Sequence, residues 1–147
     1  MGIRNIRKNG DEVLRKKCKP VEKITNRTLQ ILDDMVDTMY EADGVGLAAP
    51  QIGILQKMFV IDVYDGEGAR VFINPEILEM SGSQTGEEGC LSIPGELGEV
   101  ERANYVKVKA LNEKGEEFTL EATELLARAI QHENDHLYGK LFIDHIK

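Results

Sequence analysis

The sequence predicts an α+β domain in which short, mostly antiparallel strands pack around one helix close to the C-terminus. Short stretches between residues 57 and 121 are apolar runs or alternate apolar with polar residues, and Gly-rich turns separate them. An amphipathic helical pattern precedes these stretches at residues 26–42, and a second helical pattern follows them from residue 123. Strands that are grouped together, instead of alternating with helices, are typical of the α+β class.

Length and composition predict one globular domain over residues 1–147. With 41% hydrophobic and 30% charged residues, the chain can bury a sizeable core and remain soluble. The net charge of −8 argues against broad binding to nucleic acids or to anionic membranes. No apolar run approaches the roughly 20 residues of a membrane span, and no export signal opens the sequence. We therefore expect a cytoplasmic monomer in which Cys18 and Cys90 are thiols.

The N-terminal third contains one strong helical pattern. A short helical turn is predicted near residues 11–16, and Cys18, two residues before Pro20, is interpreted as a structural cysteine in a loop. The helix predicted at 26–42 begins after a cap at Thr25 or Asn26 and ends at residues 43–44. Its apolar stripe consists of Leu29, Leu32, Met35, Val36, Met39 and Tyr40.

The segment that follows, residues 44–53, is rich in glycine and alanine and ends its apolar run with the single amide Gln51. A bare backbone suits close approach by a ligand, although tight packing against another chain segment explains it as well. The segment is not a nucleotide-binding loop, since it lacks the Lys-Ser/Thr pair and follows a helix.

Strands are predicted at residues 57–65, 70–74, 99–101, 105–111 and 117–121, with an extended segment at 75–80. Turns at 65–68 and 112–115 join neighbouring strands. Residues 81–89 are polar and Gly-rich, and we predict a loop that leads into Cys90.

The final helical pattern contains His132, Glu133 and His136, which form an H-E-x-x-H motif. Histidines four residues apart lie on one helical face, so both can bind one metal ion, and the glutamate beside them can handle the proton of a water at that ion. Thr123 is the predicted cap and Gly139 the predicted stop. Leu125, Leu126, Ala129, Ile130 and Leu137 extend the same two stripes, so the motif faces inward.

The third ligand decides the class of metal site. Few residues follow His136, which disfavours the downstream glutamate of thermolysin-like peptidases. The last histidine of the metzincin pattern is absent, because Phe142 occupies its position, and His145 is out of register and expected at the surface. Cys90 is the best remaining ligand, and one cysteine with two histidines leaves an open position, as in catalytic sites. A metallopeptidase of another class and a non-catalytic metal-binding module remain as alternatives.

Residues 44–51, 88–92 and 131–136 resemble the three signature motifs of the peptide deformylase family, in the family's order and at about its spacing. The resemblance covers essentially the whole chain. It implies a metal-dependent hydrolase that removes the formyl group from the N-terminal formyl-methionine of new proteins in bacteria or in an organellar matrix or stroma. Cys90, His132 and His136 would hold Fe²⁺, which Zn²⁺, Ni²⁺ or Co²⁺ can replace.

The resemblance also implies roles for the remaining motif residues. Glu133 would act as general base and then acid, while the Gln51 side chain and the Leu91 backbone N–H would stabilise an oxyanion. The resemblance assigns substrate binding to two parts of the chain. The backbone at Val45, Gly46 and Gly89 would pair with the peptide, and Val45, Leu125 and Ala129 would line a pocket for the methionine side chain. The stem of Arg128 is predicted at the rim of this pocket with its head in solvent, and Asp135 is predicted to pair with Arg102.

Overall fold

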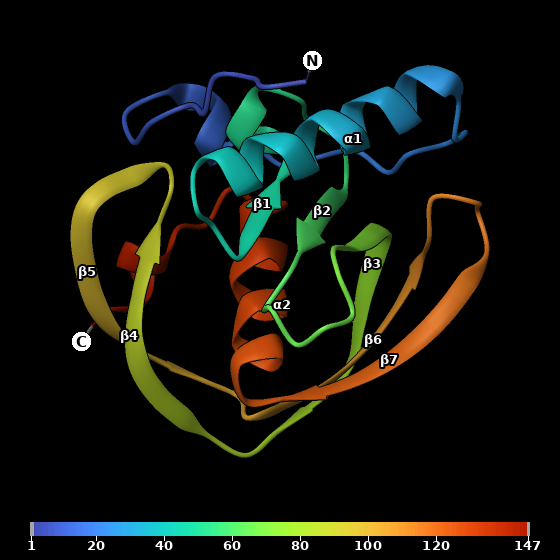
Figure 1. The fold of residues 1–147 in the computed structure, drawn as a ribbon. Helices are drawn as coiled ribbons and strands as arrows, with labels where there is room; N and C mark the ends of the chain where they lie inside the picture. Colours follow the sequence, from blue (N-terminus) through green and yellow to red (C-terminus); the bar gives the residue numbers. More distant parts are fainter. Residues whose placement is uncertain (1, 147) are drawn as a thin grey trace.

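Two antiparallel sheets and two α-helices make up the fold in the computed structural model, which describes residues 2–146. Helix α2 (Glu124–His136) runs through the middle, with strands on both sides and α1 (Asn26–Glu41) across the top in Figure 1. Three short 3₁₀ helices complete the chain: η1 (Glu12–Arg15), η2 (Ala49–Ile52) and η3 (Phe142–His145). The predicted α+β class, with mostly antiparallel strands around a C-terminal helix, is confirmed.

The larger sheet has five strands in the order β1-β2-β3-β6-β7, and every neighbouring pair is antiparallel. They are β1 (Gly46–Ala48), β2 (Met58–Ile61), β3 (Arg70–Ser81), β6 (Tyr105–Leu111) and β7 (Glu117–Thr123). The predicted alternation of β6 holds, since Val106, Val108 and Ala110 are buried. Together with Ala127 and Ile130 they belong to the core between the sheet and α2.

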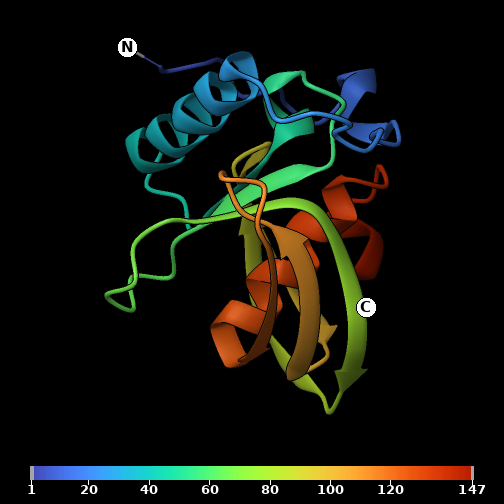
Figure 2. The same cartoon turned by 90° about the vertical axis from the view of Figure 1, so that its right-hand side faces the viewer.

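Strand β2 is buried on both faces because a helix covers each of them. Phe59 and Ile61 belong to the core around α2, whereas Met58 and Val60 belong to a second core under α1. Figure 2 shows α1 and α2 on opposite sides of this part of the sheet. A strand between two layers needs apolar residues on both faces, which explains the uninterrupted run Met58–Ile61. Thr25, one of the two predicted caps, accepts a hydrogen bond from the backbone N–H of Thr28 at 3.3 Å and so caps α1.

The smaller sheet is an arm of two strands, β4 (Gln84–Cys90) and β5 (Ile93–Arg102), that wraps the other side of α2. The prediction of a loop at 81–89 was wrong from Gln84 onward, and the strand predicted at 99–101 begins at Ile93. Most side chains of β4 are polar or absent, so the apolar alternation of a strand is missing from the sequence. Only Glu88 of this strand is buried, and its side chain lies at the candidate functional site.

Helix α2 begins and ends close to the predicted residues, but its cap differs. Thr123 occupies the N-cap position without a side-chain hydrogen bond to the helix, and the Glu124 N–H donates to the Asn104 carbonyl at 3.1 Å. At the other end Gly139 has a φ of +76°, a left-handed conformation that favours glycine, and so closes the final turn as predicted. Within residues 2–146, neither helix is long and apolar enough to cross a membrane.

Candidate metal centre

The side chains of Cys90, His132 and His136 meet where the arm crosses α2. Their ligand atoms all lie within 4.8 Å of one another, and the Cys90 Sγ is 3.5 Å from the His136 Nε2. Cys90 ends β4, and although the strand register is irregular between Glu88 and Cys90, both side chains contact α2, Glu88 at His132 and Cys90 at His136. The structure therefore brings together the three residues that the sequence predicts as metal ligands.

The environment of this cluster fits a cation. Burial lowers the pKa of His132, but the nearby Glu133, Cys90 and Glu88 outweigh burial and raise that pKa to about 10. The surroundings thus favour positive charge at this position, which a bound metal ion would supply. Burial, with the charge on His132, holds the pKa of His136 well below its usual value, and the neutral imidazole is the form that binds metals. One thiolate and two imidazoles are a donor set that divalent transition metals accept.

Glu133 lies beside the cluster, with its Oε2 4.0 Å from the His132 Nε2. The side chain is only 4% exposed, and its Oε1 has no hydrogen-bond partner in the structure. Burial raises the pKa of this carboxyl to about 7. A carboxyl with that pKa can both accept and donate a proton near neutral pH, as acid–base catalysis requires.

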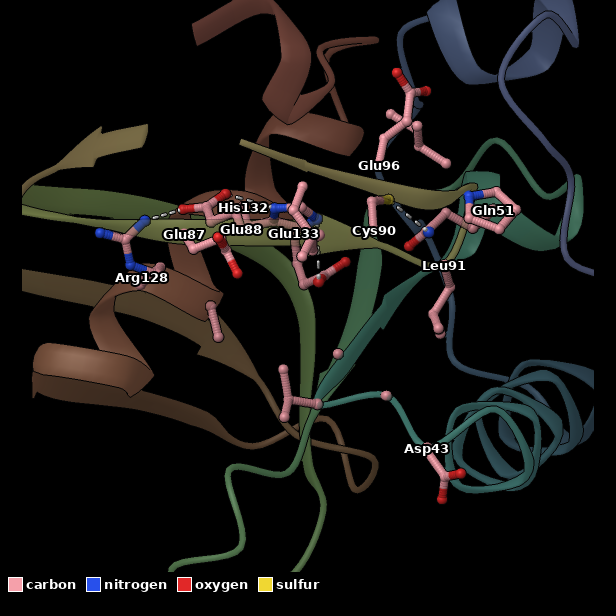
Figure 3. A pocket seen from close by; sticks show the side chains of 18 of the residues that line it. Asp43, Gln51, Glu87, Glu88, Cys90, Leu91, Glu96, Arg128, His132 and Glu133 are labelled. Atoms are coloured by element: carbon pink, nitrogen blue, oxygen red, sulfur yellow. Dashed lines mark hydrogen bonds and ion pairs between the residues drawn. The ribbon is translucent and has the colours of Figure 1, made fainter. Parts of the chain in front are cut away.

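Gln51 is held in place by both ends of its amide. Its Oε1 accepts from the Ala48 backbone N–H at 2.9 Å, and its Nε2 donates to the Ser92 Oγ at 3.0 Å. The same Nε2 also donates to the Cys90 Sγ at 3.5 Å, so the amide hydrogens are directed at Ser92 and Cys90 (Figure 3). The 3₁₀ turn η2 of the Gly/Ala-rich segment thus delivers a fixed amide donor to the metal cluster, next to Leu91.

A buried carboxylate, Glu88, contacts the cluster through His132 and is bound by two arginines. It accepts two hydrogen bonds from Arg102, both at 2.9 Å, and a further bond from Arg128. Its Oε1 also lies 3.0 Å from the His132 Nδ1. Burial raises the pKa of this carboxyl, but the hydrogen bonds from His132 and Arg102 and the charge on Arg102 outweigh burial, and Glu88 is held ionised. Figure 3 shows Glu88 between Arg128 and His132.

An open cleft of about 460 Å³ leads to this site. All of the residues predicted to bind substrate line it, and so do Gln51, Cys90, Leu91, His132 and Glu133. The predicted substrate-binding residues are Val45, Gly46, Gly89, Leu125 and Ala129. His136 lies beneath the cleft and is 1% exposed. The predicted site residues therefore occupy one continuous region, although their individual roles stay predictions.

Comparison with known proteins identifies the family. Residues 3–147 match the family described as polypeptide deformylase. The chain is 65% identical over 144 residues to a peptide deformylase of Clostridium botulinum, and this alignment covers 98% of this chain and 97% of the relative. It is 62% identical to peptide deformylase 1 of Clostridium perfringens, over 99% of each chain. This chain belongs to the peptide deformylase family. Enzymes of this family remove the formyl group from the N-terminal methionine of proteins.

Solved structures of deformylases have the same fold. The crystal structure of peptide deformylase from Thermotoga maritima superposes with a TM-score of 0.96 at 48% identity, covering 100% of this chain and 99% of that one. An actinonin-bound peptide deformylase from Acinetobacter baumannii superposes with a TM-score of 0.93 at 42% identity, covering 100% of both chains.

Two features of this deformylase were missed or mispredicted from the sequence. The prediction that the head of Arg128 reaches solvent was wrong, because Arg128 is 8% exposed and its guanidinium binds Glu88, Gln84 and the Val100 carbonyl. The inward role of Glu88 was not predicted at all, since residues 81–89 were interpreted as a loop. The predicted pair of Asp135 and Arg102 is confirmed, with Asp135 Oδ2 2.7 Å from Arg102 Nη1.

Proposed function

We propose that this deformylase hydrolyses the formyl amide with Glu133 as its proton carrier and with Cys90, His132 and His136 holding one divalent ion. The observation that carries the proposal is the position of a buried, partly unpaired carboxylate beside a Cys/His/His cluster at the bottom of an open cleft. When bound, the ion supplies Lewis-acid chemistry, which makes water a better nucleophile and polarises a carbonyl.

The proton transfers belong to Glu133. Its free Oε1 accepts the proton of the attacking water, and the same carboxyl then donates a proton to the amine that leaves. Its pKa of about 7 suits both steps, since neither protonation state is strongly favoured near neutral pH. Formate and the free amino terminus are the products.

Charge that develops on the formyl oxygen is stabilised by two donors on the cleft wall. One is the Gln51 Nε2, which the hydrogen bond to the Cys90 Sγ directs at the cluster, and the other is the Leu91 backbone N–H. Because Gln51 is 1% exposed and anchored at Ala48 and Ser92, its donor is preorganised. In other enzymes one such donor is worth about 3–4 kcal/mol of transition-state stabilisation.

The substrate is positioned by the rest of the cleft. The methionine side chain occupies an apolar pocket against Val45, Leu125 and Ala129, and the backbone of the peptide pairs with Gly46 and Gly89. The partner is therefore the formyl-Met terminus of a nascent polypeptide. We further propose a monomeric enzyme of the bacterial cytoplasm, without affinity for nucleic acid, consistent with the net charge of −8.

Formate release from formyl-Met-Ala-Ser tests the activity and the role of Glu133 together. We expect Glu133→Gln to lower kcat at least about 100-fold, because the amide cannot carry the proton. Glu113→Gln, which makes the same change at an exposed turn between β6 and β7, is the control and should leave kcat unchanged. Cleavage of internal peptide bonds by the parent enzyme would indicate a peptidase, and an active Glu133→Gln variant would remove Glu133 from the mechanism.

Ferrous iron is the ion that we propose for the working enzyme. We expect protein prepared without oxygen and loaded with iron to show a higher kcat than the zinc-loaded protein, and to lose activity in air as the thiolate and the iron oxidise. Metal content measured on the same samples serves as the control for loading. Equal kcat values for iron-loaded and zinc-loaded protein would contradict the proposal.

A further inference from the structure

An N-terminal strap, residues 4–11, runs from α1 to the arm. At its start the Arg4 N–H donates to the Thr38 Oγ1 of α1 at 2.9 Å, and Ile6 packs against the core under α1. Just after the strap, Leu14 of η1 is buried in the small core behind the arm. Figure 1 shows this dark-blue segment beside η2. The strap therefore links the core under α1 to the arm.

Two backbone hydrogen bonds tie the strap to both walls of the site. The Arg7 N–H donates to the Gln51 carbonyl and the Asn9 N–H donates to the Ser92 carbonyl, each at 2.7 Å. Gln51 belongs to η2, which follows β1 of the large sheet, whereas Ser92 lies in the turn that joins β4 to β5 of the arm. The spacing of residues 7 and 9 along the strap therefore sets η2 against this turn.

The two carbonyls lie close to both proposed oxyanion donors. Gln51 carries one donor on its side chain, and Leu91, whose N–H is the other, directly precedes Ser92. Donors from different sheets stabilise one oxygen only when they are aligned with each other, and a displacement of about 1 Å can lower a rate by up to about 100-fold. The hydrogen bond from Gln51 Nε2 to Ser92 Oγ, at 3.0 Å, aligns the side chain, and the strap holds the two backbones.

A turn inside the strap fixes the position of Asn9. The Asp11 N–H donates to the Lys8 carbonyl at 2.9 Å, and Gly10, the third residue of this turn, has a φ of +107°. A positive φ at the third position is the type II pattern, in which proline is common at the second position. Asn9 is the exposed second residue, so proline can replace it within the turn while removing the N–H that bonds Ser92.

We propose that the strap positions the two oxyanion donors against each other through the N–H groups of Arg7 and Asn9. Neither is among the described residues that line the cleft, so both are positioning residues that act through Gln51 and the turn at Leu91. Loss of one bond lets the donors move apart and lowers turnover, while peptide binding in the cleft is retained. This inference rests on the proposed deformylase function and adds a part of the chain that lies outside the cleft.

The first test removes one N–H from the strap. Metal-loaded Asn9→Pro is assayed for formate release from formyl-Met-Ala-Ser, with metal content measured on the same sample. We expect kcat to fall about 5- to 30-fold and KM to change less than about 2-fold, because the donors act in the transition state. Glu113→Pro is the control. It places proline second in the turn between β6 and β7, where the N–H donates to no described residue, and should leave kcat unchanged.

Gly10→Ala tests the same turn without proline. A Cβ at Gly10 would meet no atom within 4 Å, so the substitution acts only through the positive φ, which strains an L side chain. We expect kcat to fall about 2- to 5-fold, and this variant decides the test if Asn9→Pro does not fold. Gly66→Ala, in the loop between β2 and β3, is the matched control. Its φ is +89° and its Cβ would likewise meet nothing within 4 Å, so kcat should stay unchanged.

A double-mutant cycle separates positioning from a general loss of structure. In a Gln51→Ala background only the Leu91 donor remains, and Leu91 directly follows the proposed ligand Cys90. Asn9→Pro or Gly10→Ala should therefore lower kcat by less than about 2-fold in this background. A structural defect would instead lower kcat by the same factor in both backgrounds.

An unchanged kcat in either folded variant, or the same loss with and without Gln51, would overturn the positioning role and leave the deformylase function intact. Absence of formate release by the metal-loaded parent enzyme would overturn the proposed function and the positioning role with it.

Discussion

Glu88 fixes the orientation of His132, one of the proposed metal ligands. An ionised carboxylate can only accept hydrogen bonds, so the His132 Nδ1, 3.0 Å from Glu88 Oε1, must carry the proton. The Nε2 of a neutral His132 then presents its lone pair towards the cluster. Two arginines pair with Glu88, and Asp135 holds one of them, Arg102, from the other side. Such carboxylate–histidine pairs set the tautomer and the basicity of metal ligands.

Replacement of Arg128 by methionine removes one of the two cations that bind Glu88. We expect the free energy of unfolding to fall by about 2–4 kcal/mol, since a buried ion pair loses one partner. Zinc affinity, measured by competition with a chelator, should fall by about 10-fold or more, because Glu88 then holds His132 less firmly. Arg27→Met, at an exposed position of α1, is the matched control. Loss of stability with unchanged zinc affinity would show that Arg128 does not act through His132.

The sequence predicted the cluster of Cys90, His132 and His136 but not the support that Glu88 gives to His132. His132, Glu133 and His136 are close in the sequence, and Cys90 could be found because other ligands were missing. Glu88 and Arg128 are 40 residues apart, and their contact depends on how the arm folds over α2. The signal that was available is that Glu88 is a charged residue only two positions before the predicted ligand Cys90. It was overlooked because β4 had been interpreted as a loop.

Among the elements, β1 and α2 approach one another more closely than side chains allow. A Cβ at Gly46 would lie 2.5 Å from the Glu133 Oε2, well inside normal contact distance. Only hydrogen at this position lets the carboxylate lie against the strand beside the metal cluster. This contact explains one glycine of the bare segment, for which both a ligand and a packing interpretation remained open.

Gly46→Ala should therefore displace Glu133. We expect kcat to fall at least about 10-fold and the free energy of unfolding to fall by about 1–3 kcal/mol, as for other overpacked sites. Adding Glu133→Asp, which shortens the side chain by one methylene, should restore part of the stability without restoring kcat. Unchanged kcat in Gly46→Ala would mean that the carboxylate moves freely and that the close approach has no catalytic consequence.

Elements with a repeating apolar pattern were predicted well. The helix predicted at 26–42 is α1, and the strand predicted at 105–111 has the same bounds as β6. Strands β4 and β5 were missed or shortened because their exposed face is polar and glycine-rich, and their stability comes from pairing with each other and from a small core behind them. Such strands show no alternation of apolar and polar residues in the sequence, because one face is exposed and the inward face of β4 carries the charged Glu88.

The whole molecule is stabilised by cores on both faces of β2. Cys18 belongs to the core around α2, where it is 7% exposed, and its backbone N–H donates to the Leu137 carbonyl at 2.9 Å. It thereby joins the N-terminal segment to the end of α2. This agrees with the structural role predicted for Cys18, and both cysteines are free thiols, as predicted.

The burial of Cys18 predicts a dependence of global stability on alkaline pH. Burial raises the pKa of this thiol from its ordinary value of 9.0 to about 11. Between these values the unfolded chain loses the proton while the folded chain keeps it, so the free energy of unfolding falls as pH rises. The loss attributable to this thiol reaches about 2–3 kcal/mol.

Urea unfolding of the parent protein and of Cys18→Ala at pH 8, 9, 10 and about 11 isolates this effect from that of other groups. The variant should lose less stability over this range, whereas the two curves should run in parallel below pH 9. Parallel curves across the whole range would mean that the Cys18 thiol is not protected in the folded protein.

The two sheets each end in an open edge at the cleft. Strand β1 is the last strand of the five-stranded sheet, and β4 belongs to an arm that pairs with no other sheet within residues 2–146. Residues of both strands, Gly46 and Gly89, line the same cleft. An extended peptide bonded to both edges would join the arm to the large sheet through its own main chain. Each turnover would then stiffen the arm on arrival of substrate and release it with the product.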